Sequence, residues 1–266
     1  MIIPVSQSGE TADTLSASHL MKQNGYDQLS IVNTKNTELE RITSNSIYMR
    51  ANKEIGVAST KTFMSTLQIL FTLALHLAEN SNPKLINNKL LDDFKNLPTY
   101  MNNIFQNSKL IKQIAKKYSK YSNFLYLGRG YNYPIAMEGA LKLKELSYVH
   151  AEGYPAGEMK HGPLALIEEG MPVVVLAPRD NYYKKTISNM QEVIARGAKV
   201  LLITNKSDDE VVSENIWETI EVEDTNNDLF PFLLTIPLQK LAYYSALKKG
   251  YDIDKPRNLA KSVTVE

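Results

Sequence analysis

The feature that most constrains the fold is the regular alternation of short β-rich runs with amphipathic stretches of helical period. In the second half of the chain we expect strands at 123–127, 172–177, 199–204 and 217–222, and helices at 133–150, 182–196 and 230–249. Strands that alternate with helices in this way form a parallel sheet covered by helices. The sequence therefore predicts an α/β fold, with Gly197 and Gly250 as helix stops.

The first half repeats the alternation with fewer elements. We expect strands at 1–5, 28–33 and 46–50, and a helix at 11–24 that stops at Gly25. Both halves end in a short strand followed by a long apolar helix, which suggests two related α/β units. Open doubly wound sheets have about five strands, so a first unit with three strands is expected to be incomplete.

The apolar positions of the long helix in the first half, expected at 61–79, nearly encircle it, so burial is predicted. Beyond it the chain becomes rich in Asn and Lys, with Pro83 and Pro98 as breakers. We place connecting helices there and a boundary near Asn107. The predicted division is a partial first domain with connecting helices at 1–107, and a second domain with the C-terminal tail at 108–266.

Composition excludes several kinds of chemistry. The 30 Lys and Arg residues are balanced by 29 Asp and Glu, which leaves a net charge of +1 and no basic field for nucleic acid or an anionic membrane. No Cys is present, so disulfides, thiolate nucleophiles and Cys-ligated metals are excluded. The sequence shows neither a leader nor an apolar run long enough for a membrane span. We expect a cytoplasmic protein.

The turn Ser6-Gln7-Ser8-Gly9-Glu10-Thr11 lies between an expected strand and an expected helix. Free backbone N–H groups and the helix macrodipole favour an anion such as phosphate there. An ordinary turn with a Ser cap explains the same residues equally well. Ser59-Thr60-Lys61, before the long helix, is a weaker case of the same kind, which a cap alone explains.

Glu138, Lys142 and Glu145 are spaced to share one face of a helix. A pair of exposed ion pairs is the simpler explanation of such spacing. However, the helix follows the end of a strand, where open α/β sheets bind ligands. The following loop contains His150 and His161, two of the four histidines. His19 and His76 fall on expected helices and are interpreted as packed or solvated.

The C-terminal stretch from Asp254 would ordinarily be a frayed tail. Its Arg257, Asn258 and Lys261 are nevertheless groups that bind an anion or attack a carbonyl, if the tail folds over a site.

Five blocks together resemble the isomerase part of the glucosamine-6-phosphate synthases (glutamine–fructose-6-phosphate aminotransferases), built from paired sugar isomerase (SIS) domains. The resemblance spans nearly the whole chain. The blocks are Ser6-Gln-Ser-Gly-Glu-Thr-Ala-Asp-Thr14, Glu54-Ile-Gly-Val-Ala-Ser-Thr-Lys61, Glu138-Gly-Ala-Leu-Lys-Leu-Lys-Glu145, Gly157-Glu-Met-Lys-His-Gly-Pro163 and Pro256-Arg-Asn-Leu-Ala-Lys-Ser-Val-Thr-Val-Glu266.

The resemblance implies a role for each matched residue. It places the sugar phosphate of fructose 6-phosphate or glucosamine 6-phosphate at Ser6, Gln7, Ser8 and Thr11, and the sugar near Ser59 and Ala260. It implies that Glu145, beside Lys142, moves the proton between C1 and C2, and such a carboxylate is expected to be buried. It makes His161 a ring-opening acid/base that acts across a homodimer interface, and Lys261 the amine that engages the ketose carbonyl. No metal or organic cofactor is implied.

The sequence also departs from the family pattern. The family enzymes have a glutaminase domain with a cysteine nucleophile, and their first SIS domain begins with two strands and a Gly-Thr-Ser loop; none of these is matched here. We expect a phosphate pocket that lacks one wall and no use of glutamine by that route. Either the chain is an isomerase portion, with a separate glutaminase or N-terminal SIS chain as partner, or it is a non-catalytic phosphosugar-binding subunit.

Overall fold

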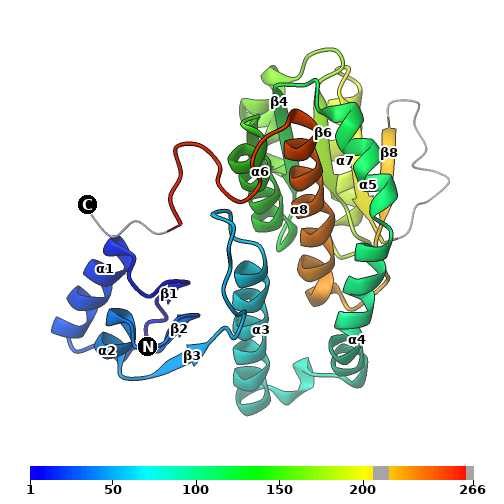
Figure 1. Cartoon of the computed structure of the whole chain (residues 1–266). Helices are drawn as coiled ribbons and strands as arrows, with labels where there is room; N and C mark the ends of the chain where they lie inside the picture. The colour runs from blue at the N-terminus through cyan, green and yellow to red at the C-terminus, as the bar shows by residue number, and fades with distance from the viewer. Residues whose placement is uncertain (206–215, 262–266) are drawn as a thin grey trace. The chain divides into compact units, whose positions relative to one another are not determined.

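A computed structural model describes residues 1–205 and 216–261 of the chain (Figure 1). These residues form two compact units. Unit 1 comprises residues 1–86 and the tail that starts at Asp254, and unit 2 comprises residues 87–253. In both units the strands run parallel and alternate with helices, which confirms the predicted α/β class.

Unit 2 contains a five-stranded parallel sheet of order β5-β4-β6-β7-β8. Its strands are β4 (Asn123–Gly128), β5 (His150–Pro155), β6 (Pro172–Leu176), β7 (Lys199–Thr204) and β8 (Ile216–Glu221). All residues of β6 are buried, as expected for a Val- and Leu-rich strand at the centre of a sheet covered on both faces. The edge strand β5 was expected to be part of a loop, because its Gly, Pro and charged residues conceal a strand pattern.

The helices of unit 2 are α4 (Asn88–Gln106), α5 (Ser108–Tyr118), α6 (Asn132–Ser147), α7 (Tyr183–Ile194) and α8 (Phe230–Lys249), with short 3₁₀ turns at Ala156–His161, Pro163–Leu166 and Asn227–Leu229. One face of the sheet packs its alternate residues, such as Leu125 and Val173, against Met190 and Val193 of α7. Helix α8 has the predicted bounds and ends at Gly250, which adopts a φ of 74°.

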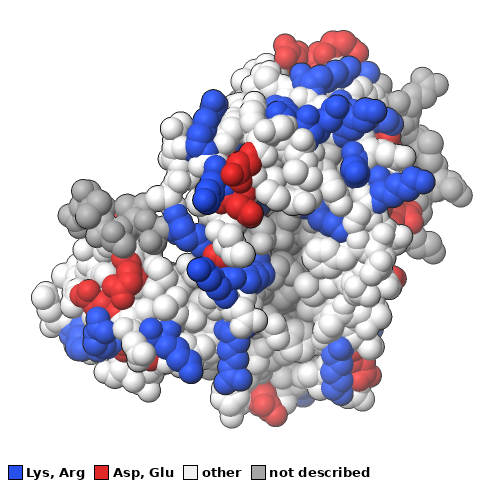
Figure 2. Space-filling model, in the orientation of Figure 1, with Lys and Arg blue, Asp and Glu red and all other residues white. Residues whose placement is uncertain are grey.

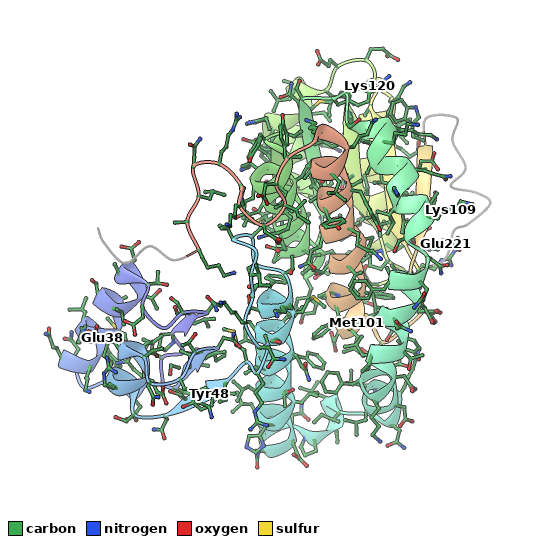
Figure 3. All side chains as sticks on the ribbon, in the orientation of Figure 1. Glu38, Tyr48, Met101, Lys109, Lys120 and Glu221 are labelled. Atoms are coloured by element: carbon green, nitrogen blue, oxygen red, sulfur yellow. The ribbon has the colours of Figure 1, made fainter. Side chains whose placement is uncertain are left out.

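Unit 1 contains a three-stranded parallel sheet of order β1-β2-β3, made of Val5–Ser6, Ser30–Val32 and Ser46–Tyr48. The helices α1 (Ala12–Gln23) and α2 (Glu38–Thr43) connect these strands, and α3 (Lys61–Ser81) follows with a 3₁₀ turn at Pro83–Leu85. Tyr48 of β3, labelled in Figure 3, donates a hydrogen bond to Glu40 of α2. That bond ties the last strand to the helix that precedes it.

The prediction that the long apolar helix of the first half is buried was wrong. Thr62 is the one buried residue of α3, whereas Leu70 and Leu77 are 39% and 58% exposed. In unit 2, by contrast, α8 buries most of its first thirteen residues. The strands of unit 1 have two or three residues each and offer too little surface to cover an apolar helix.

The observed division of the chain differs from the predicted division at residue 107. Helix α4 belongs to unit 2, where Asn103 donates to Glu223 and Asp93 accepts from the backbone N–H of Asn226. The tail belongs to unit 1, where Val57 N donates to Asp254 O at 2.9 Å. Long-range hydrogen bonds of this kind leave no periodic pattern in a sequence.

Candidate functional site

The three residues predicted to share a helical face lie together on α6. Lys142 Nζ donates to Glu145 Oε2 at 2.7 Å and lies 3.7 Å from Glu138 Oε1. Lys142 is 2% exposed and Glu138 is 8% exposed, so the interpretation as exposed ion pairs does not hold. An ammonium therefore lies between two carboxylates inside unit 2.

This burial results from close packing of α6 against α8 and β5. A Cβ at Gly139 would lie 2.7 Å from Leu238 Cδ1 of α8, and a Cβ at Gly153 of β5 would lie 2.7 Å from Met137 Cα of α6. Only a residue without a side chain allows such approaches. Two glycines thus permit the contacts that remove water from this part of α6.

Glu138 has the most perturbed acidity of the cluster. Burial raises its pKa to about 7, an effect that the charge of Lys142 partly offsets and the charge of Glu145 reinforces. In the described part of the chain, Glu138 Oε1 has no hydrogen-bond partner. Glu138 is therefore a carboxyl group that changes charge near neutral pH.

Glu145 differs from the expectation that it is a buried carboxylate. Its side chain is 22% exposed, so it is the member of the cluster that solvent or a ligand reaches. Sequence reasoning did not give Glu138 a role of its own. A usable signal was its i, i+4 spacing to a lysine, next to a glycine that admits a neighbouring helix.

His161 lies at the end of the 3₁₀ turn Ala156–His161, with its side chain 75% exposed. Among the described residues, its charged partner is Glu158, whose Oε2 lies 3.8 Å from His161 Nε2. His150 similarly lies beside Glu152. The structure does not join His161 to the cluster on α6 by any hydrogen bond or ion pair among the described residues.

The predicted phosphate turn connects β1 to α1 and is closed by its own hydroxyls. Ser6 Oγ accepts from Gly9 N and hydrogen-bonds to Thr11 Oγ1, both at 3.0 Å, and Ser8 Oγ accepts from Glu10 N. Gln7 contributes its carbonyl, which accepts from Asn33 N. The N-cap residue Thr11 makes no side-chain hydrogen bond to the start of α1. The Thr11 side chain therefore does not cap the first backbone N–H groups of that helix.

A buried threonine lies directly against this turn. The side chain of Thr37 occupies the space that a Cβ at Gly9 would fill, and Gly9 itself has a φ of 72°. Thr37 is 3% exposed, and its Oγ1 has no hydrogen-bond partner in the part of the chain that the structure describes. At this turn, the Gly9 backbone thus lies close to the Thr37 side chain, whose hydroxyl is unpaired among the described residues.

Lys261 and Ser59 belong to a second polar network, within unit 1. Lys261 Nζ donates to Glu54 Oε2 at 2.9 Å and to Gly56 O at 2.7 Å. Thr62 donates its hydroxyl to the same carboxylate and hydrogen-bonds to Ser59 Oγ at 2.6 Å. Ala260, the residue before Lys261, is exposed.

Glu54 is the centre of this network, and sequence reasoning gave it no role. Burial by itself would raise its pKa, but the hydrogen bonds from Thr62, Thr60 N and Lys261 outweigh that effect and lower it. Glu54 therefore remains ionised. Its position shortly before a helix that starts with Thr60-Lys61 was the available signal, because helix N-termini favour carboxylates.

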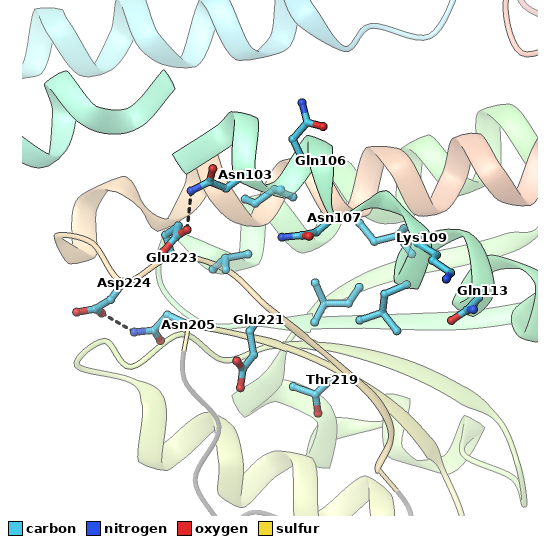
Figure 4. Close-up of a pocket in the computed structure, with 15 residues that line it drawn as sticks. Asn103, Gln106, Asn107, Lys109, Gln113, Asn205, Thr219, Glu221, Glu223 and Asp224 are labelled. Atoms are coloured by element: carbon cyan, nitrogen blue, oxygen red, sulfur yellow. Dashed lines mark hydrogen bonds between the residues drawn. The ribbon is translucent and has the colours of Figure 1, made fainter. Parts of the chain in front are cut away.

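Unit 2 also contains a groove of about 900 Å³ (Figure 4). It is lined by α4, α5, β8, the segment that follows β8, and Asn205 at the end of β7. Two hydrogen bonds join polar side chains of its lining: Asn103 donates to Glu223, and Asn205 donates to Asp224. None of the predicted site residues lines this groove.

Charge is distributed over the face shown in Figure 2 in small groups of Lys and Arg with Asp and Glu between them. Among the described residues no cluster of three His, Asp or Glu has the arrangement of a metal site. In the same residues no helix is long and apolar enough to cross a membrane.

Comparison with known families decides the relationship. The SIS domain family matches residues 1–76 and 117–249. This chain belongs to the SIS domain family. The match covers parts of both units of this SIS protein, as the resemblance of its sequence blocks implied.

Curated relatives extend the SIS assignment. The chain is 46% identical over 266 residues to glutamine–fructose-6-phosphate aminotransferase [isomerizing] of Aquifex aeolicus, and 47% identical over 268 residues to that of Chlorobaculum tepidum. Each match covers the whole of this chain but only 44% and 43% of the relative. This SIS protein therefore spans less than half the length of the relatives it matches.

Solved structures agree with the sequence relatives. The C-terminal domain of glucosamine-fructose-6-phosphate aminotransferase from Francisella tularensis has a TM-score of 0.90 at 41% identity, over 95% of this chain and 72% of that one. Glucosamine-6-phosphate deaminase from Thermotoga maritima has a TM-score of 0.78 at 27% identity, over 98% and 74%. The isomerase part of the aminotransferase is thus the region that this SIS protein resembles.

Proposed function

We propose that the chain is the isomerase portion of a glucosamine-6-phosphate synthase, converting the ketose fructose 6-phosphate to an aldose phosphate. The observation that carries this proposal is the buried Lys142 ammonium between Glu138 and Glu145. Isomerisation needs a carboxylate that takes a proton from carbon and a cation that stabilises the developing oxyanion. The names of the curated relatives supply the substrate class.

In this proposal Glu145 is the base, because it is the partly exposed carboxylate of the cluster. It removes a proton from C1 of the open-chain ketose, the electron pair of the C–H bond forms the C1=C2 bond, and the π pair of the C2=O bond moves to O2. A proton passes from O1 to O2, the enediolate pair re-forms a C1=O bond, and the proton held by Glu145 returns to C2, which gives the aldose. Lys142 positions Glu145 through the 2.7 Å hydrogen bond and supplies positive charge beside the enediol oxygens.

The phosphate is assigned to the turn of unit 1. Ser6, Gln7, Ser8 and Thr11 precede a twelve-residue helix whose N-terminus favours an anion. Ser59 and Ala260 are assigned to the sugar, and Lys261 to the ketose carbonyl. An amine that attacks C2 forms a carbinolamine and, after loss of water, an imine.

Conversion in deuterated water tests the proposal. Wild type is incubated with fructose 6-phosphate, with and without ammonium, and followed by NMR. We expect an aldose phosphate with deuterium at C2, and with ammonium an aminated product. Glu145→Gln should lower the rate by about 100-fold or more, since general-base catalysis contributes about 10²–10⁴.

Glu168→Gln is the matched control, because Glu168 is exposed and lies in the same unit. It should retain the wild-type rate. Absence of any turnover or exchange, under conditions where a full-length relative is active, would contradict the proposal. Calorimetric binding of fructose 6-phosphate without turnover would instead support a non-catalytic phosphosugar-binding subunit. No contact among the described residues specifically favours that alternative.

We further propose that the active species is a homodimer in which His161 opens the sugar ring in the site of the other copy. The support is the 75% exposure of the His161 side chain, which leaves its imidazole available to a neighbour. Mixing inactive Glu145→Gln with inactive His161→Asn should restore activity, because one site of the hybrid keeps both residues. No restoration in a demonstrated hybrid would place His161 in its own copy's site.

A separate glutaminase chain is proposed as the source of ammonia. Addition of that chain together with glutamine should then replace ammonium in the reaction.

A further inference from the structure

Glu54 caps helix α3 from the loop that precedes it. Its Oε1 accepts from the backbone N–H groups of Thr60 at 2.8 Å and Lys61 at 3.1 Å, at the point where the helix begins. Thr60, the N-cap residue, makes no side-chain cap bond of its own. One carboxylate oxygen therefore replaces the usual cap and meets the positive end of the helix dipole.

The other carboxylate oxygen of Glu54 holds the tail. Its Oε2 accepts from Lys261 Nζ at 2.9 Å, and Lys261 also donates to Gly56 O at 2.7 Å and approaches Val57 O at 3.5 Å. A lysine ammonium has three N–H donors and no acceptor. All three donors therefore face acceptors of the loop 54–57.

Thr62 connects this arrangement to Ser59. The Thr62 hydroxyl donates to Glu54 and lies 2.6 Å from Ser59 Oγ. The two residues assigned to the sugar and its carbonyl, Ser59 and Lys261, are thus joined through one buried carboxylate. The Glu54 side chain is only 3% exposed, so this charge is shielded from solvent.

We propose that Glu54 is a positioning residue that stores Lys261 as an unreactive ammonium at the N-terminus of α3 until substrate displaces it. An ammonium whose N–H groups all face acceptors of the loop 54–57 has no lone pair to direct at a carbonyl. Release from Glu54 and loss of a proton must therefore precede attack. The role of this arrangement in catalysis rests on the proposed function. The holding of Lys261 by Glu54 does not depend on it.

Selective acetylation tests the storage without substrate. The full chain is treated with an amine-acetylating reagent at pH 8, and the rates at Lys261 and Lys61 are read by peptide mass spectrometry. Glu54→Gln keeps the size of the side chain and removes its charge. We expect acetylation of Lys261 to accelerate about ten-fold in this variant, because the charge-assisted hydrogen bond that holds Nζ against the loop is weakened.

Lys61 is the internal control, since its Nζ donates to the backbone carbonyl of Lys53 at 2.7 Å and it shares the same helix start. Its rate should stay within two-fold in Glu54→Gln. Thr62→Val is the second variant: it removes a hydroxyl from the network but keeps the Glu54 charge, so Lys261 should remain slow. If burial alone slowed the acetylation of Lys261, Lys261 would react slowly in both variants.

Equal Lys261 rates in wild type and folded Glu54→Gln would overturn the proposal. If that variant does not fold, the wild-type protein still gives a test, because the hydrogen bonds of Lys261 Nζ to Glu54 and the loop should make it react about ten-fold more slowly than Lys61. Equal rates for the two lysines would contradict storage. Because no step uses fructose 6-phosphate, failure here is distinguishable from failure of the proposed isomerisation.

Discussion

Lys142 donates to Glu145 over 2.7 Å although Lys142 is almost fully buried and Glu145 is partly exposed. The pair therefore connects the interior of unit 2 with its accessible surface. Glu138 completes the interior side. The first two predictions concern the charges of this cluster.

Lys142→Met should destabilise the protein in a pH-dependent way. Removing one partner of a buried ion pair costs about 3–5 kcal/mol when the other charge stays. At pH 5 Glu138 is protonated and leaves no uncompensated buried charge when Lys142 is removed. We therefore expect the larger loss in free energy of unfolding at pH 8. Urea unfolding at both pH values measures the difference. Lys144→Met, exposed on the same helix, is the control and should change little; equal losses for Lys142→Met at both pH values would contradict the prediction.

Glu138→Gln should remove a pH dependence of stability. The folded pKa of about 7 lies above the unfolded value, so the folded state binds the extra proton. The contribution of Glu138 is complete below about pH 4.3 and is lost as pH rises through about 7, at about 1.4 kcal/mol per pKa unit and so about 4 kcal/mol in total. Denaturation curves between pH 4 and 8 should show this slope in wild type but not in Glu138→Gln. An unchanged slope would place the buried proton elsewhere.

Gly9→Ala should damage the phosphate turn more than Gly25→Ala damages the end of α1. Both glycines have positive φ, 72° and 76°, but only Gly9 has the Thr37 side chain in the way of a Cβ. Backbone strain of about 1 kcal/mol is common to both variants, and overpacking adds about 1–3 kcal/mol at Gly9. Thermal unfolding compares them. Equal losses of stability in the two variants would mean that the Thr37 side chain moves aside at no cost, and would contradict the prediction.

Tyr126→Phe should stabilise unit 2. Tyr126 is fully buried on β4, burial raises its pKa, and its hydroxyl has no hydrogen-bond partner among the described residues. Removal of an unsatisfied buried hydroxyl gains about 1 kcal/mol. Tyr154→Phe is the contrasting variant, because Tyr154 donates to Glu152 and its loss should not stabilise. A lower melting temperature for Tyr126→Phe would contradict this reading of the β4 environment.

Local signals were sufficient for most of the fold. Helix α8 was predicted to its ends because its composition, its apolar run and Gly250 agree. Helix α3 has a similar apolar run, yet its burial was predicted wrongly. Burial depends on how much sheet surface is available, which the helix's own sequence does not contain.

The candidate site was predictable where it depends on one helix. The shared face of Lys142 and Glu145 follows from their spacing on α6, and the structure brings them together. The difference in exposure between Glu138 and Glu145 was not predictable, because the burial of Glu138 depends on α8, which lies about a hundred residues further along the chain. The bond from Lys261 to Glu54 likewise joins residues far apart in sequence.

Gly139 has a consequence for the acidity of its neighbour. Because it lacks a side chain, α8 approaches α6 closely enough for Leu238 to contact the helix backbone region beside Glu138, and Gln239 faces the Glu138 carboxyl. The proton affinity of this carboxyl is therefore set by the spacing of two helices. Changes to distant packing residues that widen this spacing would admit water and lower the pH at which Glu138 changes charge, without altering any charged group of the cluster.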